Sequence, residues 1–362
     1  MKVLTSIIVP TYKEAENIQP LTEKINAVLK KYNIEYEIII VDDNSHDGIE
    51  EVVKVMAGKY PVSLIVRTNE RGLSSAVIEG LKRSRGDILV VMDADLSHPP
   101  EKIPELIKEI TNNNADFVVG SRFVEGGSAL HFDWYRKMNA WISKMLARPF
   151  TKVKDPMAGF FAFPRTIMCD LGILNPLGFK IGLELIVKCN PRKTVEVPIQ
   201  FQERLHGESK LSLREQFLYL FHLRRLFMYK YKKLAEFLQF AVIGSIGMIV
   251  DLAFVYISYG LLSLPFRIAR VVGFVFALTN NFLLNRRFTF PDSRGGNIIR
   301  QYAGFFSVCL VGFGVNWIIS VYLYEHLPFF NRYYLVAAFA GIVGGLAVNF
   351  LGSKFFVFKN SR

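Results

Sequence analysis

The chain has 362 residues, of which 51% are hydrophobic, and its mean hydropathy is positive. These values exclude an ordinary soluble protein, and because the apolar excess begins at about Leu234, we expect a soluble domain followed by a membrane domain. The 44 Lys and Arg outnumber the 32 Asp and Glu. Many basic residues flank the apolar blocks, which favours a membrane or a phosphorylated substrate as partner and argues against nucleic acid.

The first half alternates short apolar runs with segments of helical periodicity. Strands are expected over residues 3–9, 36–41, 62–67, 87–92, 116–122 and 194–199, with amphipathic helices between them, including one over 72–84. This alternation is typical of an α/β domain with a mostly parallel sheet. The first apolar run is too short for a signal peptide. The cysteines Cys169, Cys189 and Cys309 show no paired spacing, so we expect them to be reduced.

The fourth expected strand ends in two acids, Asp93 and Asp95. Ligands of open α/β sheets bind beyond the carboxyl ends of the strands, where two carboxylates suit Mg²⁺ or Mn²⁺ carrying a diphosphate. A lone Asp-x-Asp is weak, because acids also cap ordinary loops. The first strand leads into Pro10-Thr-Tyr-Lys-Glu14 and not into a glycine-rich phosphate loop, so a metal ion is expected to hold the phosphates.

Several motifs occur in a recognisable order. They are Pro10-Thr-Tyr-Lys-Glu14, Val41-Asp-Asp-Asn-Ser45, Arg71-Gly-Leu73, Met92-Asp-Ala-Asp95, His98-Pro-Pro-Glu101, Gly120-Ser-Arg122, Asp155-Pro-Met-Ala-Gly159, and Arg204 with Gly207-Glu-Ser-Lys210. Over about residues 3–212 the chain resembles inverting glycosyltransferases of the dolichyl-phosphate mannose synthase type. The resemblance implies a GT-A fold, a GDP-mannose donor and a polyprenyl phosphate acceptor such as dolichyl phosphate.

The resemblance also implies roles for individual residues. Catalysis would depend on Asp93, Asp95 and Arg204, and the metal would be held by Asp93 and Asp95, with Ser97 standing where the family has a polar amide residue. The acceptor phosphate would be bound by Arg122, Arg136 and Ser209. The donor would be bound by Pro10, Tyr12, Glu14, Asp42, Asp43, Asp93, Ala94, Asp95, Lys180, Arg204 and Lys210.

Plainer interpretations stay open for some of these residues. The stretch from Asp42 to Asp47 also fits a capped helix start, with Asn44 or Ser45 as N-cap. Arg136 also fits the solvated face of a helix over 134–148, in which Ala140 replaces a serine common in the family. Lys180 also fits an ordinary surface lysine, and the histidines are interpreted as loop residues.

The acceptor chemistry needs cations and no general base. A sugar hydroxyl must lose a proton to attack, whereas a phosphate monoester is already anionic at neutral pH. A guanidinium group can bind a phosphate through two parallel hydrogen bonds. Arginine is therefore the residue type expected on the acceptor side.

The second half contains long apolar segments and an internal repeat, and with them it resembles a GtrA-type membrane module. Residues 211–233 fit an interfacial amphipathic helix, or a plain surface helix, and spans are expected at about 235–260, 266–285, 302–325 and 333–353. The placement of basic residues predicts both termini, and the catalytic domain, in the cytoplasm. Asn281-Phe-Leu-Leu-Asn-Arg-Arg-Phe-Thr-Phe290 parallels Asn349-Phe-Leu-Gly-Ser-Lys-Phe-Phe-Val-Phe358, which predicts two helix pairs in one orientation.

Five polar residues fall at membrane depth or its edge: Asp251, Asn280, Asn281, Asn316 and Asn349. Unpaired polar groups are costly there, and interhelical hydrogen bonding is favoured over a path for lipid phosphate.

These observations predict three segments: a GT-A domain over 1–210, an interfacial region over 211–233 and a four-helix membrane domain over 234–362. The expected reaction transfers mannose from GDP-mannose to dolichyl or another polyprenyl phosphate at the cytoplasmic membrane face, with inversion. The alternatives are a UDP-glucose-dependent transferase, and a flippase or scaffold with a nucleotide-sensing domain. The sequence makes no prediction of oligomeric state.

Overall fold

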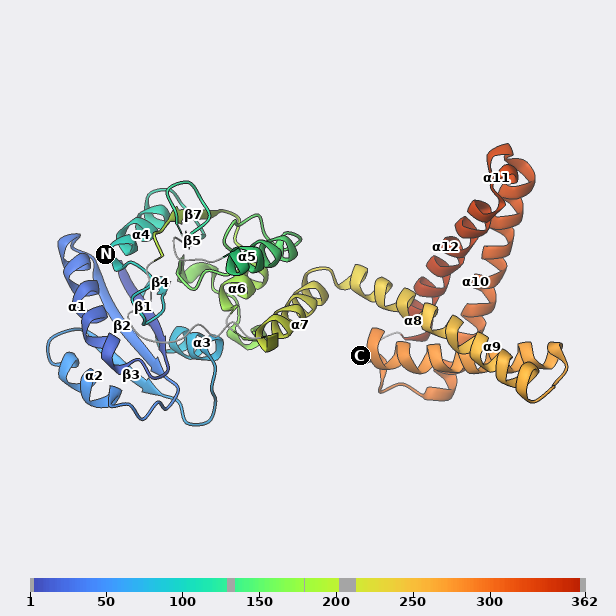
Figure 1. Cartoon of the computed structure of the whole chain (residues 1–362), viewed down its shortest axis with the longest axis horizontal. Helices are drawn as coiled ribbons and strands as arrows, with labels where there is room; N and C mark the ends of the chain where they lie inside the picture. Colours follow the sequence, from blue (N-terminus) through green and yellow to red (C-terminus); the bar gives the residue numbers. More distant parts are fainter. Residues whose placement is uncertain (1–2, 129–133, 179, 202–212, 359–362) are drawn as a thin grey trace. The chain divides into compact units, whose positions relative to one another are not determined.

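The structure, a computed structural model, describes residues 3–128, 134–178, 180–201 and 213–358. The chain divides into two compact units, Met1–Lys230 and Tyr231–Arg362. Each unit is built from its own elements (Figure 1).

The first unit contains one seven-stranded sheet, with the strand order β3-β2-β1-β4-β6-β5-β7. Strand β6 is antiparallel to both β4 and β5, and the other pairs are parallel. The strands are β1 (Leu4–Thr11), β2 (Glu35–Asp42), β3 (Val62–Val66), β4 (Ile88–Val91), β5 (Phe117–Ser121), β6 (Phe161–Pro164) and β7 (Thr194–Pro198). Six lie where the sequence predicts them, whereas β6 was not predicted, because a four-residue run ending in proline carries too little periodicity to mark a strand.

Helices cover both faces of this sheet because successive strand residues point to opposite sides. Ile7 belongs to the core beneath α1 (Ala15–Lys31), α2 (Ile49–Ala57) and α4 (Ile103–Thr111). Ile8 belongs to the core beneath α3 (Leu73–Arg83) and α6 (Ile181–Cys189). In Figure 1, α1 and α2 lie on one side of the sheet and α3 on the other. Both strand faces are therefore apolar, as a central parallel strand requires.

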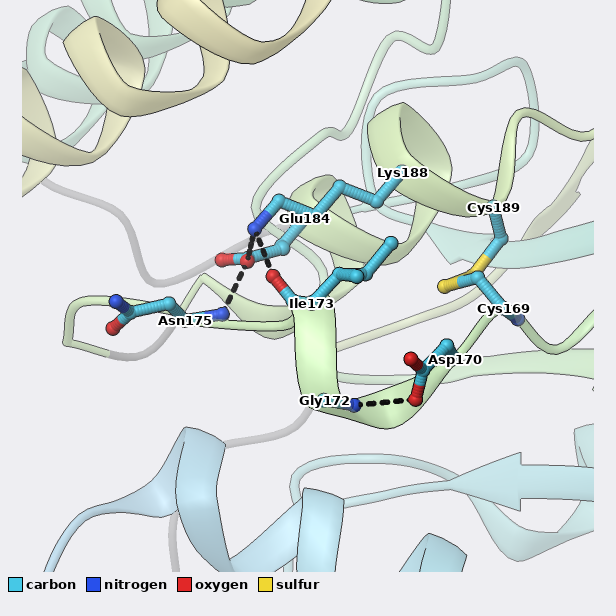
Figure 2. Close-up of a disulfide and its surroundings, with 8 residues drawn as sticks. All are labelled: Cys169, Asp170, Gly172, Ile173, Asn175, Glu184, Lys188 and Cys189. Atoms are coloured by element: carbon cyan, nitrogen blue, oxygen red, sulfur yellow. Dashed lines mark hydrogen bonds and ion pairs between the residues drawn. A yellow bond between two sulfur atoms is a disulfide. The ribbon is translucent and has the colours of Figure 1, made fainter. Parts of the chain in front are cut away.

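Two of the cysteines predicted to be reduced form a disulfide, Cys169–Cys189, with 4.9 Å between their Cα atoms. Figure 2 shows it beside the short helix η3 (Leu171–Ile173) and the end of α6. The prediction was wrong because a separation of 20 residues gives no local sign of pairing. The fold places Cys169, just before η3, beside the end of α6, so the two Cα atoms lie within the usual range for a disulfide.

Helix α7 (Leu213–Lys230) lies within the segment expected to be interfacial. One side of it is buried in the first unit through Tyr219, His222 and Leu226. The opposite side exposes Phe217 and Phe221. Helix α5 (Trp134–Ala147) also belongs to this unit. Large exposed apolar side chains on α7 are typical of a helix that lies in a membrane surface.

The second unit is helical. It contains α8 (Lys232–Val255), η4 (Tyr256–Leu261), α9 (Phe266–Leu284), η5 (Asn285–Thr289), η6 (Pro291–Ser293), α10 (Ile298–His326), α11 (Pro328–Arg332), α12 (Tyr334–Gly352) and η7 (Ser353–Val357). Within the described residues, three helical segments are long and apolar enough to cross a membrane: Lys232–Leu261, Ile298–His326 and Phe339–Val357. The expected span at 266–285 corresponds to α9 and is not one of these three, so a count of four spans stays a prediction.

Helix α8 packs on α9, and α10 packs on α12, whereas a common orientation of the two pairs stays a prediction. The end of each helix pair contacts the start of the other pair, at positions that are equivalent in the repeat. Phe282 of α9 meets Tyr302 of α10 edge to face at 5.2 Å, and Phe350 of α12 meets Phe240 of α8 in the same way at 5.7 Å. The last aromatic residues of the two repeats, Phe290 and Phe358, stack on each other with centroids 4.9 Å apart. An ion pair, Glu236–Lys354, adds a link between the helix pairs.

The interhelical hydrogen bonds predicted for the membrane asparagines are not made by two of the side-chain oxygens in the described residues. The Oδ1 atoms of Asn281 and Asn349 are buried without a hydrogen-bond partner there. Each side chain packs on a glycine of the neighbouring helix, Gly247 for Asn281 and Gly312 for Asn349, where a Cβ would overlap the amide. Small residues let these helices approach closely, as is common in membrane helix pairs.

Candidate active site

Three strands bring their polar ends to one edge of the sheet. Strand β1 lies between β2 and β4 and runs parallel to both. Thr11 at the end of β1 is opposite Asp42 at the end of β2. Asp93 comes two residues after β4 ends at Val91. The segments from Pro10 to Glu14, Asp42 to Asp43 and Asp93 to Asp95 therefore share the edge where open α/β sheets bind ligands.

The turn after β4 is held by two residues that follow the aspartates. The Ser97 hydroxyl donates to Asp95 Oδ1 at 2.6 Å, and the Ser97 backbone N–H donates to the same atom at 3.1 Å. His98 Nδ1 accepts from the Asp93 backbone N–H at 3.0 Å. The His98 ring is 3% exposed and stacks on Phe160 at 5.4 Å. His98, interpreted from sequence as a loop residue, is therefore a buried support of the Asp93–Asp95 turn.

These contacts bear on the predicted metal ligands. Asp93 keeps 27% of its side chain exposed and Asp95 is 5% exposed. Ser97 is fully buried and donates a hydrogen bond from its hydroxyl to Asp95, so in the structure it orients a predicted ligand. Among the residues that the structure describes, no group of three or more His, Cys, Asp or Glu could hold a metal. Two carboxylates still fit Mg²⁺ or Mn²⁺, since such ions take one or two carboxylates and complete their shell with phosphate oxygens and water.

The antiparallel strand β6 adds a second set of residues to this edge. Because β6 runs against β4, the segment that precedes it lies beside the end of β4. A Cβ built on Gly159 would be 3.2 Å from both carboxylate oxygens of Asp93. In the same segment, Asp155 accepts two hydrogen bonds from the Arg122 guanidinium, at 2.7 and 2.8 Å. The fold thus places Arg122, Asp155 and Asp93 in one cluster.

The carboxylates of Asp155 and Asp93 stabilise the charged form of Arg122. Burial disfavours its charged form, but the carboxylates of Asp155 and, less strongly, Asp93 outweigh burial, so the pKa of Arg122 is raised. The Asp155 side chain is fully buried, whereas Arg122 keeps 15% of its side chain exposed. Arg122 is therefore a fixed, permanently charged guanidinium beside the predicted metal ligands, which suits an anionic substrate group.

Tyr12 and Asp42 are both predicted to bind the nucleotide, but they differ in how far they are exposed. Tyr12 is 36% exposed, and the guanidinium carbon of Arg71 lies 5.6 Å from its ring centroid. Asp42 is 1% exposed and accepts from the Thr11 hydroxyl and, at 2.8 Å, from the Ser45 backbone N–H. Asp42 thereby fixes the turn after β2. The predicted N-cap at Asn44 or Ser45 is wrong, because α2 starts at Ile49 behind Gly48.

Asp43 connects two loops at the same edge. Its Oδ2 accepts from the Gly72 backbone N–H at 2.6 Å, and Arg67 forms a salt bridge with Oδ1. Both Asp43 and Arg67 are buried. Asp43 therefore positions the start of α3 in addition to any contact with a nucleotide.

The remaining predicted residues are placed as follows. Pro10 is buried in β1, and Ala94 is 3% exposed between the two aspartates. Glu14 stands at the N-cap of α1, where its Oε2 accepts from Asn17 Nδ2. Lys180 is partly buried, with its Nζ 6.0 Å from the Tyr219 ring centroid, so it is no ordinary surface lysine.

Four predictions lie outside what the structure describes. Arg204, Ser209 and Lys210 fall in the gap between residues 201 and 213. Arg136 lies on α5, but its side chain is not among those described. Their roles remain predictions from the resemblance.

Three residues of this site stand in motifs of the resemblance but were given no site role from the sequence: His98, Asp155 and Gly159. Asp155 and Gly159 could be located from their motif, but the residues that they contact could not be predicted. Asp155 is 33 residues from Arg122, and the contact between them depends on the unpredicted strand β6.

Comparison with known proteins agrees with the division of the chain into a first unit that holds the site and a helical second unit. Residues 6–172 match glycosyl transferase family 2, and residues 239–358 match the GtrA/DPMS transmembrane domain. These matches confirm a GT-A-type domain followed by the helical domain of an integral membrane protein.

Three proteins illustrate the similarity. The dolichol-phosphate mannosyltransferase of Pyrococcus furiosus is 40% identical over 355 residues, which cover 97% of each chain. That of Saccharomyces cerevisiae is 42% identical over 242 residues, covering 64% of this chain and 90% of its own. The crystal structure of mannosyl-3-phosphoglycerate synthase from Rubrobacter xylanophilus has a TM-score of 0.48 and 18% identity, covering 62% of this chain and 74% of its own.

Proposed function

The chain belongs to the dolichol-phosphate mannosyltransferase family of glycosyltransferases, and we propose that it transfers mannose from GDP-mannose to a polyprenyl phosphate such as dolichyl phosphate. The observation that carries the proposal is the cluster of Asp93, Asp95 and Arg122 at the carboxyl edge of the sheet. Carboxylates that can hold a divalent ion lie there beside a guanidinium that suits a phosphate.

The donor occupies this edge in the proposal. Asp93 and Asp95 would hold Mg²⁺ or Mn²⁺, and the bound ion supplies positive charge opposite the departing nucleoside diphosphate. Tyr12, Glu14 and Asp43 line the neighbouring strand ends and would meet the nucleotide, with Lys180 and Arg204 on the donor phosphates. Ser97 and His98 keep the two aspartates in place through the hydrogen bonds described above.

The acceptor enters as a phosphate monoester. One of its oxygens forms the new bond to sugar C1 while the bond from C1 to the diphosphate breaks, so a single displacement inverts the anomeric centre. No proton has to be removed from the acceptor, which is anionic at neutral pH. Arg122, oriented by Asp155, would bind this phosphate together with Arg136 and Ser209.

The membrane arrangement completes the proposal. A GT-A domain over residues 1–210 lies in the cytoplasm, residues 211–233 lie in the membrane surface, and residues 234–362 cross the bilayer four times with both termini cytoplasmic. The apolar exposed side of α7 and the three apolar helical segments within the described residues support this arrangement. Basic residues on the expected cytoplasmic side support the orientation.

The proposal is tested with purified full-length protein, Mn²⁺, a short-chain polyprenyl phosphate and a panel of labelled nucleotide sugars. GDP-mannose should give a lipid-linked β-mannose, and Asp95→Ala should lower the rate by two or more orders of magnitude, as loss of a group that stabilises transition-state charge does. Asp170→Ala is the matched control, because this exposed acid caps η3 and belongs to no predicted site. Transfer from UDP-glucose instead would reassign the donor, and full activity of Asp95→Ala would refute the catalytic assignment.

A further inference from the structure

Helix α7 reaches the candidate site through Glu215, the acidic residue of its first turn. The Glu215 carboxylate lies against Gly178, so closely that a Cβ built on this glycine would be 2.8 Å from Oε2. Gly178 has φ +66°, a conformation that favours glycine. The backbone conformation therefore favours glycine at this point, two residues before Lys180, and the carboxylate of Glu215 would have to move to admit a side chain there.

Gly178 and Lys180 are also contacted by α3 and by a second residue of α7. The Ser74 hydroxyl of α3 donates to the Gly178 carbonyl at 2.7 Å. One turn along α7 from Glu215, the Tyr219 ring lies 6.0 Å from Lys180 Nζ, within the range of a cation–π contact. Tyr219 is itself fixed, since its hydroxyl donates to the Ser143 carbonyl of α5 at 2.7 Å. Lys180 thus stands over a helix whose position is set by several contacts.

The charges around Lys180 explain why an acid is needed. Burial and the neighbouring Arg122 both lower the pKa of Lys180, whereas the carboxylates of Glu215 and Asp155 oppose this shift. Asp155 is already engaged by two hydrogen bonds from Arg122. Glu215 is the acid of α7 whose charge opposes the lowering of the pKa of Lys180 by burial and by Arg122.

We propose that Glu215 is a positioning residue, which holds Lys180 toward the nucleoside diphosphate of the donor and links α7 to donor binding. The inference rests on the proposed function, in which Lys180 contacts the donor. No bond is made or broken by Glu215. Its effect is to keep the ammonium group of Lys180 charged and correctly placed.

The experiment measures GDP and UDP binding to the full-length protein in detergent with Mn²⁺, and the pH profile of kcat/KM for GDP-mannose. Glu215→Gln should weaken binding of the preferred nucleotide about tenfold, the scale of one charge-assisted contact. It should also move the alkaline limb of the profile to lower pH, because Lys180 then loses its proton more easily. Glu215→Asp should restore part of both effects, and Gly178→Ala, which displaces the carboxylate, should reproduce them.

Two controls separate positioning from general damage. Arg225→Gln removes a 3.0 Å hydrogen bond from α7 to the Asn175 side chain of the same loop and should leave nucleotide binding unchanged. In a Lys180→Ala background, Glu215→Gln should have no further effect on binding, since the two residues act through one group. Equal losses in both backgrounds would overturn the proposal, as would wild-type binding by Glu215→Gln.

The outcomes also separate this inference from the proposed function. If the wild type makes lipid-linked mannose and Glu215→Gln binds GDP normally, the positioning role fails and the proposed function stands. If the wild type transfers no mannose, but loss of nucleotide binding in Glu215→Gln depends on Lys180, the donor assignment fails and the positioning role stands. If the wild type binds neither GDP nor UDP, both fail.

Discussion

Asp93 is confined by a glycine from a segment 66 residues away along the chain. Both of its carboxylate oxygens would lie 3.2 Å from a Cβ on Gly159, which is tight for a carbon–oxygen contact. The absence of a side chain at this position is therefore part of how the acid is placed. Ser97 positions Asp95 by donating a hydrogen bond from its hydroxyl to Asp95 Oδ1.

A single methyl group at residue 159 should disturb this placement. We expect Gly159→Ala to push the Asp93 carboxylate by a few tenths of an ångström and to lower kcat/KM on the order of tenfold to a hundredfold, because small misplacements in an active site are costly. The checks are Mn²⁺ titration of activity and the thermal unfolding midpoint. Gly58→Ala is the matched control, since its Cβ would meet only the Val55 carbonyl at an ordinary 3.5 Å.

At the scale of elements, α6 and α7 meet through a buried histidine. His222 is fully buried, and its Nδ1 lies 3.6 Å from Glu184 Oε2. Both ring nitrogens have no hydrogen-bond partner in the part of the chain that the structure describes. Burial lowers the pKa of His222 to about 4, although Glu184 opposes the shift. The helix pair thus buries a neutral imidazole that ionises readily once exposed.

The pH dependence of stability follows from this depressed pKa. The unfolded chain takes up the proton near its ordinary pKa of about 6.5, before the folded chain does, so the stability contribution is complete above that pH. It is lost as the pH falls from about 6.5 to 4, by on the order of 3 kcal/mol at most.

His222→Gln should flatten the fall of the first unit's unfolding midpoint between pH 7 and 4.5. His46→Gln, on an exposed loop, should leave the slope unchanged. An unaltered slope in His222→Gln would show that other groups govern the acid lability.

The helix pair α10 and α12 approaches closely at Gly312. Its Cβ position is occupied by the Asn349 side chain, whereas Gly314, two residues later, has open space around it. We expect Gly312→Leu to destabilise the membrane unit by about 1–3 kcal/mol, as overpacking typically does, and Gly314→Leu to have little effect. Unfolding midpoints of the two variants in detergent test this, and equal midpoints would contradict the close contact.

At the scale of the whole molecule, the chain separates into compact units at residue 230. The residues of the candidate site that the structure describes all lie in the first unit, as do Ser143 and Asn175, the hydrogen-bond partners of Tyr219 and Arg225 on α7. We therefore expect a protein ending at Lys230 to bind nucleotide and to glycosylate a short-chain polyprenyl phosphate. Transfer to a long-chain lipid in vesicles should fall, because the anchor is missing. Loss of nucleotide binding on truncation would show that the second unit is needed to build the site.

The local pattern of the sequence determined much of this architecture. Alternating apolar runs and helical periodicity are short-range properties, so six strands and the two-part organisation were readable from them. Asp93, Asp95 and Arg122 were identified because they stand at the ends of such runs within motifs. The helix pairs of the second unit were visible as an internal repeat.

Only the tertiary structure decided which distant residues meet. The direction of β6 brings Asp155 and Gly159 to Arg122 and Asp93. The fold also brings Cys169 to Cys189, and the packing of α7 places the Glu215 carboxylate against Gly178. These contacts join segments that no periodicity relates, because long-range pairing depends on how whole elements pack. The residue types of the site could thus be predicted from the sequence, whereas the partners that orient them depend on the tertiary fold.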